Sequence, residues 1–355
     1  MQITITDPVF KPKSKYNFAE AFFLKFIRDE RDLPFIWLML RITFIIIPIA
    51  IFLFFYFTWW LAVPFLIVNT AIGLGPYILM LHNTSHRKLF KQEYNWMNNI
   101  IPWALGPFYG ETPETYFAHH VMMHHAENNL IDDLSCTMHY RRDSFLDFMK
   151  YFVLFLFLGM VDLGYYFKRK QRRKFLIKIL FGEVGFLIMC AVLWQFNSQA
   201  TLMVFLLPFV LARFLMMAGN WAQHAFIDGK NPSNSYGNSI TCINCGYNKQ
   251  CFNDGYHIGH HLRPTMHWTD MPNEFYTNIQ KYKDNNAIVF QGTDFFMIWF
   301  LLMTKNYRTL AGHYIDIRRQ FKSTDETIAF LKSRVAVLPV QRISLNANVI
   351  FNGIR

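Results

Sequence analysis

The feature that most constrains this chain is a run of 40 residues, 42–81, that contains no Asp, Glu, Lys, Arg or His. A helix needs about 20 apolar residues to cross the hydrocarbon core of a bilayer, so this run is long enough to cross twice. Its middle, FTWWLAVP at 57–64, carries two tryptophans, which are favoured at the membrane interface. The run therefore predicts a helical hairpin that enters the membrane and returns.

A second run of the same length, 184–223, contains a single charge, Arg213. Its middle, QFNSQA at 195–200, is polar but uncharged, as expected for a short turn between two spans. Arg213 lies in the returning span, where its side chain would either extend to the interface or meet a buried partner. We expect a second hairpin here, and the whole chain has 53% hydrophobic but only 17% charged residues, below the globular norm of about 25%.

These runs predict an all-α integral membrane protein of one domain, 1–355. Two transmembrane hairpins, four spans in all, would carry a helical cap on the cytoplasmic side. The cap would contain the segments 1–41, 82–183 and 224–355.

The orientation follows from charge. The segment KRKQRRK at 168–174 is the densest basic run, and both far-side turns lack Lys and Arg. Basic loops remain in the cytoplasm, so we expect a multi-pass protein with both termini and the cap on that side. The net charge of +11 would suit anionic lipid or an acidic protein, and because the basic residues flank apolar runs we expect no nucleic acid partner.

Three other segments are less uniform in composition. Residues 151–167 are apolar apart from Asp162 and just reach the length of a span. A span there would separate the histidine clusters described below, so we predict a helix lying in the membrane interface. The segment 287–303, with Asp294, is predicted as an interfacial or packing helix, and residues 1–33 lack the short apolar core of a signal sequence.

Eight of the 13 histidines fall in three tight clusters, HNTSH at 82–86, HVMMHH at 120–125 and HIGHH at 257–261. The last three imidazoles would share one helix face and converge. Packed imidazoles repel one another when protonated, so neutral, metal-bound rings are expected. His224 in NWAQH adds a ninth, more than one tetrahedral zinc accepts, which predicts two metal ions of higher coordination. The predicted ligands are His82, His86, His120, His124, His125, His224, His257, His260 and His261.

Imidazole alone does not choose among Zn, Cu, Fe and Ni. The chain has no HExxH motif of zinc proteases and no Glu-x-x-His motif of ferritin-like sites. A metal transporter or storage protein would place its ligands at the bilayer midplane, whereas these clusters lie at or beyond the hairpin ends. A C-x2-C-x5-C pattern at Cys242, Cys245 and Cys251 lacks the fourth ligand of a zinc knuckle, so reduced thiols are expected.

In their order and intervals the three clusters resemble the histidine boxes of the integral-membrane fatty acid desaturases, HxxxH, a box ending in HH, and HxxHH. NWAQH is similar to an Asn-xxx-His element of some members, and the resemblance covers roughly residues 35–270. One departure is that three residues separate His120 from His124, where many members have two. His119 is thus an alternative first ligand of that box, and we favour His120. His139, His267 and His313 lie outside the pattern.

The resemblance implies a non-haem di-iron centre with two Fe ions. Such a centre uses O2 and two electrons to remove two hydrogens from a lipid acyl chain. The nine histidines would be its ligands, and Asn220 would hold a metal-bound water. A di-iron hydroxylase or oxygenase of fatty acids, sterols or carotenoids is the alternative on the same scaffold. The chain has no haem, dinucleotide or ferredoxin motif, so a separate electron donor, ferredoxin or cytochrome b5, is expected at the basic face.

Overall fold

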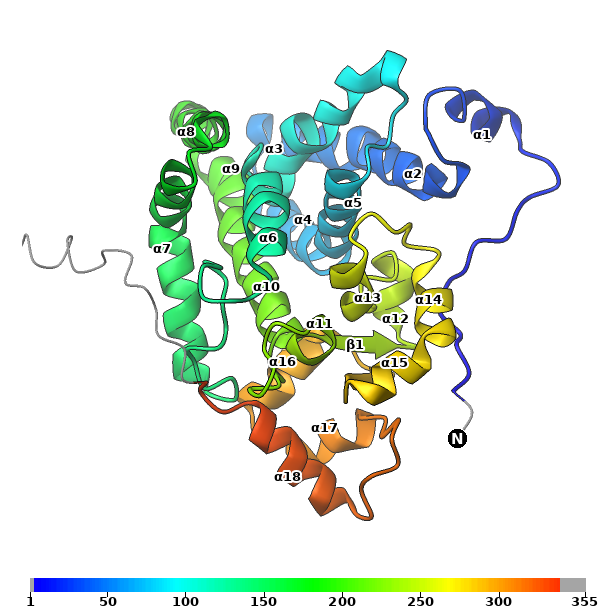
Figure 1. Ribbon diagram of the computed structural model, residues 1–355. Coiled ribbons are helices and arrows are strands. Elements are labelled where there is room, and N and C mark those ends of the chain that lie inside the picture. Colours follow the sequence, from blue (N-terminus) through cyan, green and yellow to red (C-terminus); the bar gives the residue numbers. More distant parts are fainter. Residues whose placement is uncertain (1–2, 339–355) are drawn as a thin grey trace, which may run out of the picture.

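The computed structural model describes residues 3–338, which are mostly helical (Figure 1). The predicted single domain and its termini extend over residues 1–2 and 339–355, which lie outside the described residues. Within 3–338, four helices are long and apolar enough to cross a membrane. They are Glu30–Phe55, Trp59–His86, Arg173–Phe196 and Ser198–Gln223. The number of spans agrees with the sequence prediction.

The first two of these helices extend beyond the predicted hairpin at 42–81. They comprise the 3-10 turn Glu30–Asp32, α2 (Leu33–Arg41), a π-helical segment (Ile42–Ile46), α3 (Ile47–Phe55), α4 (Trp59–Val68), a second π-helical segment (Asn69–Leu74) and α5 (Gly75–His86). The side chain of Asp29 caps the start by accepting a hydrogen bond from the backbone N–H of Arg31 (3.1 Å). The helix ends thus contain charged residues, and a search for uncharged runs does not include them.

The second pair comprises α8 (Arg173–Phe196), α9 (Ser198–Thr201), a π-helical segment (Leu202–Leu206) and α10 (Leu207–Gln223). α8 begins at Arg173, ahead of the predicted start near residue 184, because its first turns carry the charged residues of the membrane boundary. Asn197, between α8 and α9, donates from Nδ2 to the carbonyl of Phe54 at the end of α3 (3.2 Å). The connections within the two pairs therefore lie side by side.

Large apolar side chains are exposed along these four helices. Trp60 is 92% exposed and Phe196 80%, and both lie beside the two connections. A soluble protein rarely exposes a continuous apolar surface of this kind, whereas a bilayer accommodates it. Tryptophans near the connections, Trp59, Trp60 and Trp194, match the aromatic belt of a membrane interface.

α7 (Phe145–Arg169) confirms the helix predicted over 151–167. It is not among the four candidate membrane helices of the described chain, and it packs against α8 and α10. Its position in the membrane interface stays a prediction.

The prediction of an all-α fold was wrong at one place. β1 (Ile240–Ile243) and β2 (Ile288–Gln291) form a two-stranded parallel sheet in which Ile240 pairs with Ile288. The segment 287–303 is therefore not one helix. Gly292 adopts a φ of 67°, and α16 (Phe295–Met303) begins only after Asp294, whose Oδ1 accepts from the N–H of Met297 (2.9 Å).

The remaining elements are short. They are α1 (Phe18–Phe23), the 3-10 segments Gln92–Asn99 and Gly106–Tyr109, the π-helical segments Ile100–Leu105 and Phe117–His124, α6 (His125–Glu127), α11 (Ser235–Asn238), α12 (Gly246–Gln250), α13 (His257–Leu262), α14 (Met271–Thr277), α15 (Ile279–Asp284), α17 (Tyr307–His313) and α18 (Thr324–Arg334). α10 reaches from the candidate membrane helices into this region, where Trp221 packs with Phe148 and α16. In Figure 1, α17 and α18 lie at the opposite end of the molecule from α3 and α8.

Candidate metal centre

The structure brings all nine predicted histidines together, in two groups. Within each group, one ring nitrogen of every member lies within 4.8 Å of those of the others. The first group contains His82, His86, His120, His125 and His260, and the second contains His124, His224, His257 and His261. They are supplied by the end of α5, the π-helical segment and α6, the end of α10, and α13.

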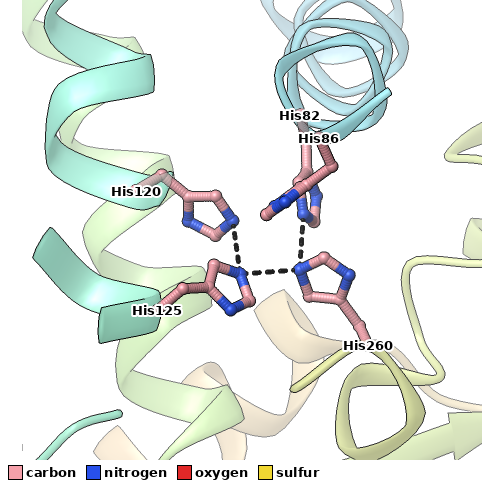
Figure 2. A group of neighbouring side chains, drawn as sticks. All are labelled: His82, His86, His120, His125 and His260. Atoms are coloured by element: carbon pink, nitrogen blue, oxygen red, sulfur yellow. Dashed lines mark hydrogen bonds between the residues drawn. The ribbon is translucent and has the colours of Figure 1, made fainter. Parts of the chain in front are cut away.

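In the first group the rings point toward a common centre (Figure 2). Nε2 of His260 lies 2.8 Å from Nε2 of His82 and 2.8 Å from Nε2 of His125, and the latter lies 3.1 Å from Nε2 of His120. A ring nitrogen carries either one proton or one in-plane lone pair. Nε2 of His260 and Nε2 of His125 each face two other ring nitrogens, so hydrogen bonds cannot satisfy every contact. A cation accepting all the lone pairs resolves this conflict.

The second group is arranged in the same way. Nε2 of His257 lies 3.0 Å from Nε2 of His261 and 3.4 Å from Nε2 of His224. The ring of His124 stands with its centroid 5.2 Å from that of His224 and 5.3 Å from that of His261. Four imidazoles with no carboxylate among them suit Zn, Cu, Fe or Ni, so the donor set fits iron without selecting it.

Neighbouring histidines divide between the two groups. The sequence predicted that the imidazoles of α13 converge on one point, but His260 belongs to the first group and His261 to the second. Successive residues of an α-helix point about 100° apart, so one short helix can face two centres. His124 and His125 divide in the same way.

The unusual spacing of the second box has a local structural cause. Residues 117–124 form a π-helical segment, and the N–H of His125 bonds to the carbonyl of His120. This i→i+5 pattern places residues five apart on one face, where an α-helix places residues four apart. The wider turn accommodates the additional residue between His120 and His124, and the rings of His120 and His125 meet in the first group.

Polar groups beside the outer ring nitrogens orient several of these rings. Nδ1 of His82 lies 3.2 Å from Oδ1 of Asp254, and Nδ1 of His124 lies 2.7 Å from Oδ2 of Asp133. Nδ1 of His224 donates to the carbonyl of Asn238 (2.9 Å). A partner at Nδ1 fixes the tautomer and turns the Nε2 lone pair toward a metal. Neither Asp133 nor Asp254 was predicted from the sequence, although both lie within ten residues of a histidine box.

Burial favours the neutral form of six of these histidines. It holds the pKa of five of them well below the usual value, and the neighbouring imidazoles lower it further; these are His120, His125, His257, His260 and His261. The pKa of His224 falls to about 3, mainly through burial and then through His124. The neutral ring is the form that binds metal, so the site is ready for a cation at neutral pH.

Asn220 and His119 lie beside the two groups and belong to neither. Asn220 donates from Nδ2 to the hydroxyl of Tyr151 (2.7 Å) and to the carbonyl of Ser135 (3.1 Å). Nε2 of His119 lies 3.0 Å from Oγ of Ser135, and burial lowers the pKa of His119 to about 4. His120 rather than His119 is therefore the member of this box that faces the other imidazoles. The role of Asn220 toward a metal-bound water stays a prediction.

The cysteines take no part in a metal group within residues 3–338. Cys242, Cys245 and Cys251 are buried free thiols. Burial raises the pKa of each thiol, to about 11 for Cys245, and the thiolate is the form that binds metal. Of the histidines outside the pattern, His267 bonds to Asp32 (2.9 Å), as expected of a structural residue.

A cavity of about 900 Å³ adjoins the two groups. Its wall includes His82, His120, His124 and His257 together with Asn220. Most of the remaining wall is apolar and comes from α7 and from three of the four candidate membrane helices; examples are Leu66, Ile67, Ala71, Leu156, Leu187 and Phe209. A long hydrocarbon chain suits such a cavity, since burial of its apolar surface is favourable.

The comparisons with known proteins agree with this arrangement. The family model described as "Fatty acid desaturase" matches residues 57–293, more than half of the chain, and the match contains all nine histidines. Neither the search of curated proteins nor the search of solved structures returned a match. Together with the two histidine groups beside an apolar cavity, the family match establishes that the chain belongs to the fatty acid desaturase family.

Proposed function

We propose that the protein is a membrane-bound acyl desaturase with a non-haem di-iron centre. The reaction would convert a CH2–CH2 pair of a lipid acyl chain to CH=CH and reduce O2 to two waters, with two electrons and two protons supplied from outside. The observation that carries the proposal is the convergence of nine imidazoles, in two groups, at the wall of an apolar cavity. Iron bound there would supply the oxidising power that an unactivated C–H bond requires.

The residues of the chain would divide the remaining tasks. The nine histidines would hold two iron ions, five rings for one and four for the other. Asp133 and Asp254 would keep two of the rings in the binding tautomer. The apolar wall would align the acyl chain and exclude bulk water, which favours reaction at one position along the chain.

The membrane orientation is part of the proposal. α5 ends at His86 and α10 at Gln223, so both returning helices deliver histidines at the same side. The basic run 168–174 extends from the end of α7 into the start of α8, and by the positive-inside rule we infer that this side is cytoplasmic. A separate ferredoxin or cytochrome b5 would bring electrons there, and the lipid substrate would enter from the bilayer.

The test is lipid analysis of cells that express the chain, beside a His260→Ala control, with iron measured on the purified proteins. His260 contacts both His82 and His125, so its removal is expected to abolish turnover and to lower the bound iron. New unsaturated chains in the wild type alone, with about two irons per chain, are the expected result. Oxygenated products would instead identify a hydroxylase, and full activity of His260→Ala would disprove the metal site.

His313→Ala is the matched control. His313 bonds to the carbonyl of Gln291 and lies outside both histidine groups, so its loss removes an imidazole without removing a predicted ligand. We expect it to keep the iron content and the products of the wild type.

A further inference from the structure

The third histidine box lies on a helix that is too short to hold its own position. α13 has six residues, and its N-cap residue Tyr256 makes no side-chain capping bond. An isolated helix shorter than about 12 residues is barely stable in water. α13 nevertheless supplies imidazoles to both histidine groups. Contacts from other parts of the chain must therefore fix its direction.

An N-terminal arm, residues 3–8, binds the loop that leads into α13. The side-chain amide of Asn244 accepts from the N–H of Thr6 (2.7 Å) and donates from Nδ2 to the carbonyl of Thr4 (2.8 Å). The arm also adds two partly buried side chains to the apolar cluster that contains Tyr256, namely Ile3 and Ile5. The arm is thus held on this loop, although 238 positions separate Thr6 from Asn244.

One carboxylate oxygen of the arm joins the two ends of the loop. Oδ2 of Asp7 accepts from the backbone N–H of Asn244 (2.6 Å) and from the hydroxyl of Tyr256 (2.7 Å). Both side chains of the second contact are buried, with Asp7 5% exposed and Tyr256 1%. A hydrogen bond to a charged acceptor is about twice as strong as one between neutral groups. Asp7 therefore fixes the place of the Tyr256 ring.

Tyr256 connects this contact to the imidazoles. Its carbonyl accepts a hydrogen bond from the N–H of His260 (3.0 Å), which begins α13, and His257 follows it directly in the sequence. A change in the direction of α13 would move imidazoles of the first and the second group together. The arm therefore acts on both groups through one residue.

We propose that Asp7 is a positioning residue for the metal centre, which holds α13 through Tyr256 in the direction that both histidine groups require. This inference rests on the proposed function, since it takes the two groups as iron sites. Asp133 and Asp254 each lie beside one histidine of a single group, so weakening of both sites at once distinguishes the loss of Asp7 from the loss of either.

The test is titration of the metal-stripped protein with Fe(II) against a chelator, at a temperature well below unfolding. Tyr256→Phe removes only the hydroxyl that bonds to Asp7, and we expect it to weaken both iron sites about tenfold. Asp7→Ala should do the same, and the combined variant should bind iron no more weakly than Asp7→Ala alone, because both changes remove one contact. Asp7→Asn, which keeps an acceptor oxygen, should retain part of the affinity.

Tyr16→Phe is the matched control. It removes a tyrosine hydroxyl that bonds to Oε2 of Glu30 (2.6 Å), away from the support of α13, so both iron affinities should equal those of the wild type. The melting temperature of each metal-free variant shows whether it folds, and Tyr256→Phe carries the test if Asp7→Ala does not.

The inference is overturned if Tyr256→Phe binds iron as the wild type does, whatever its melting temperature, or if only one of the two sites is weakened. Equal loss of affinity in Tyr16→Phe would overturn it as well. A wild-type protein that binds no iron would refute the proposed function together with this inference. Two irons held equally by the wild type and Tyr256→Phe would refute the role of Asp7 alone.

Discussion

Single residues outside the two histidine groups hold the imidazoles in place, and this allows each group to be weakened separately. Asp133 supports His124 of the second group, and Asp254 supports His82 of the first. Asp133→Asn is expected to lower the affinity of the second group for iron by about 10–100-fold and to leave the first unchanged. Asp254→Asn should have the reverse effect.

Titration of metal-stripped protein with Fe(II) against a chelator measures this difference. Each variant should show one wild-type site and one weakened site. If both variants weaken the same site, or neither weakens any, the orienting role of the carboxylates is refuted.

The sequence could predict the nine histidines because a ligand cluster leaves a local pattern, such as the i, i+4 pair His82 and His86. It could not predict Asp254 as the partner of His82, because these two residues are brought together only by the fold. It also left Arg213 undecided, since its partner Glu183 lies on another helix. Partners that are distant in sequence leave no periodic signal.

Among the elements, α8 lies close against the loop around Pro113. A Cβ added to Gly182 would lie 1.9 Å from the carbonyl oxygen of Pro113, whereas one added to Gly185 would meet nothing within 4 Å. Gly182→Ala must therefore displace the loop, and we expect it to lower the free energy of unfolding by about 1–3 kcal/mol. Gly185→Ala, on the same helix, should leave it unchanged.

Thermal unfolding in detergent compares the two variants. Equal melting temperatures would show that α8 and the loop separate without cost and would contradict the close approach. Gly182→Ala should also weaken binding in the cavity, since the displaced loop carries part of its wall.

The type of an element could be predicted where a long segment is uniformly apolar. It was harder to predict where elements are short and apolar and polar residues are mixed. The apolar run 287–303 contains a strand, a break at Gly292 and a helix, and hydropathy alone does not separate them. The π-helical segment at 117–124 is likewise invisible to a search for helical period. The backbone hydrogen bond from His125 to His120 shows this segment, and the segment explains the spacing of His120 and His124.

The molecule as a whole should lose stability in acid when it is metal-free. Folding holds the pKa of His120, His125, His224, His257, His260 and His261 below the ordinary value of about 6.5. Below about pH 6.5 the unfolded chain therefore binds more protons than the folded chain, and the free energy of unfolding falls as the pH falls.

Thermal unfolding of chelator-stripped protein at about pH 7.5 and about pH 5 measures this effect, and the melting temperature should be lower at the acidic pH. Substituting His260 and His261 together by Gln should reduce the difference, because two of the shifted groups are gone. A melting temperature that is equal at both pH values would refute the neutral, buried state of the rings.

At the scale of the whole molecule, more of the structure could be predicted from the sequence than at the scale of residues or elements. Two runs of 40 residues with at most one charge predicted the four candidate membrane helices of the described chain, since few other structures accommodate such runs. The hydrogen bond from Asn197 to Phe54, which joins the two connections, is consistent with the predicted common side of the turns. The parallel sheet of β1 and β2 was not predicted, because its strands are only four residues long and paired residues such as Cys242 and Phe290 lie 48 positions apart in the sequence.

The division of neighbouring histidines between two groups has a consequence for the folding and the turnover of the protein. His82 and His260 are 178 positions apart, so an ion bound between them closes a very large loop of chain. His260 and His261 tie that closure to the second group. Two bound ions would thus hold α5, which is synthesised early, against α13, which is synthesised much later. A cell short of iron would accumulate unfastened chains, open to proteolysis, and iron supply would set the amount of the protein as well as its activity.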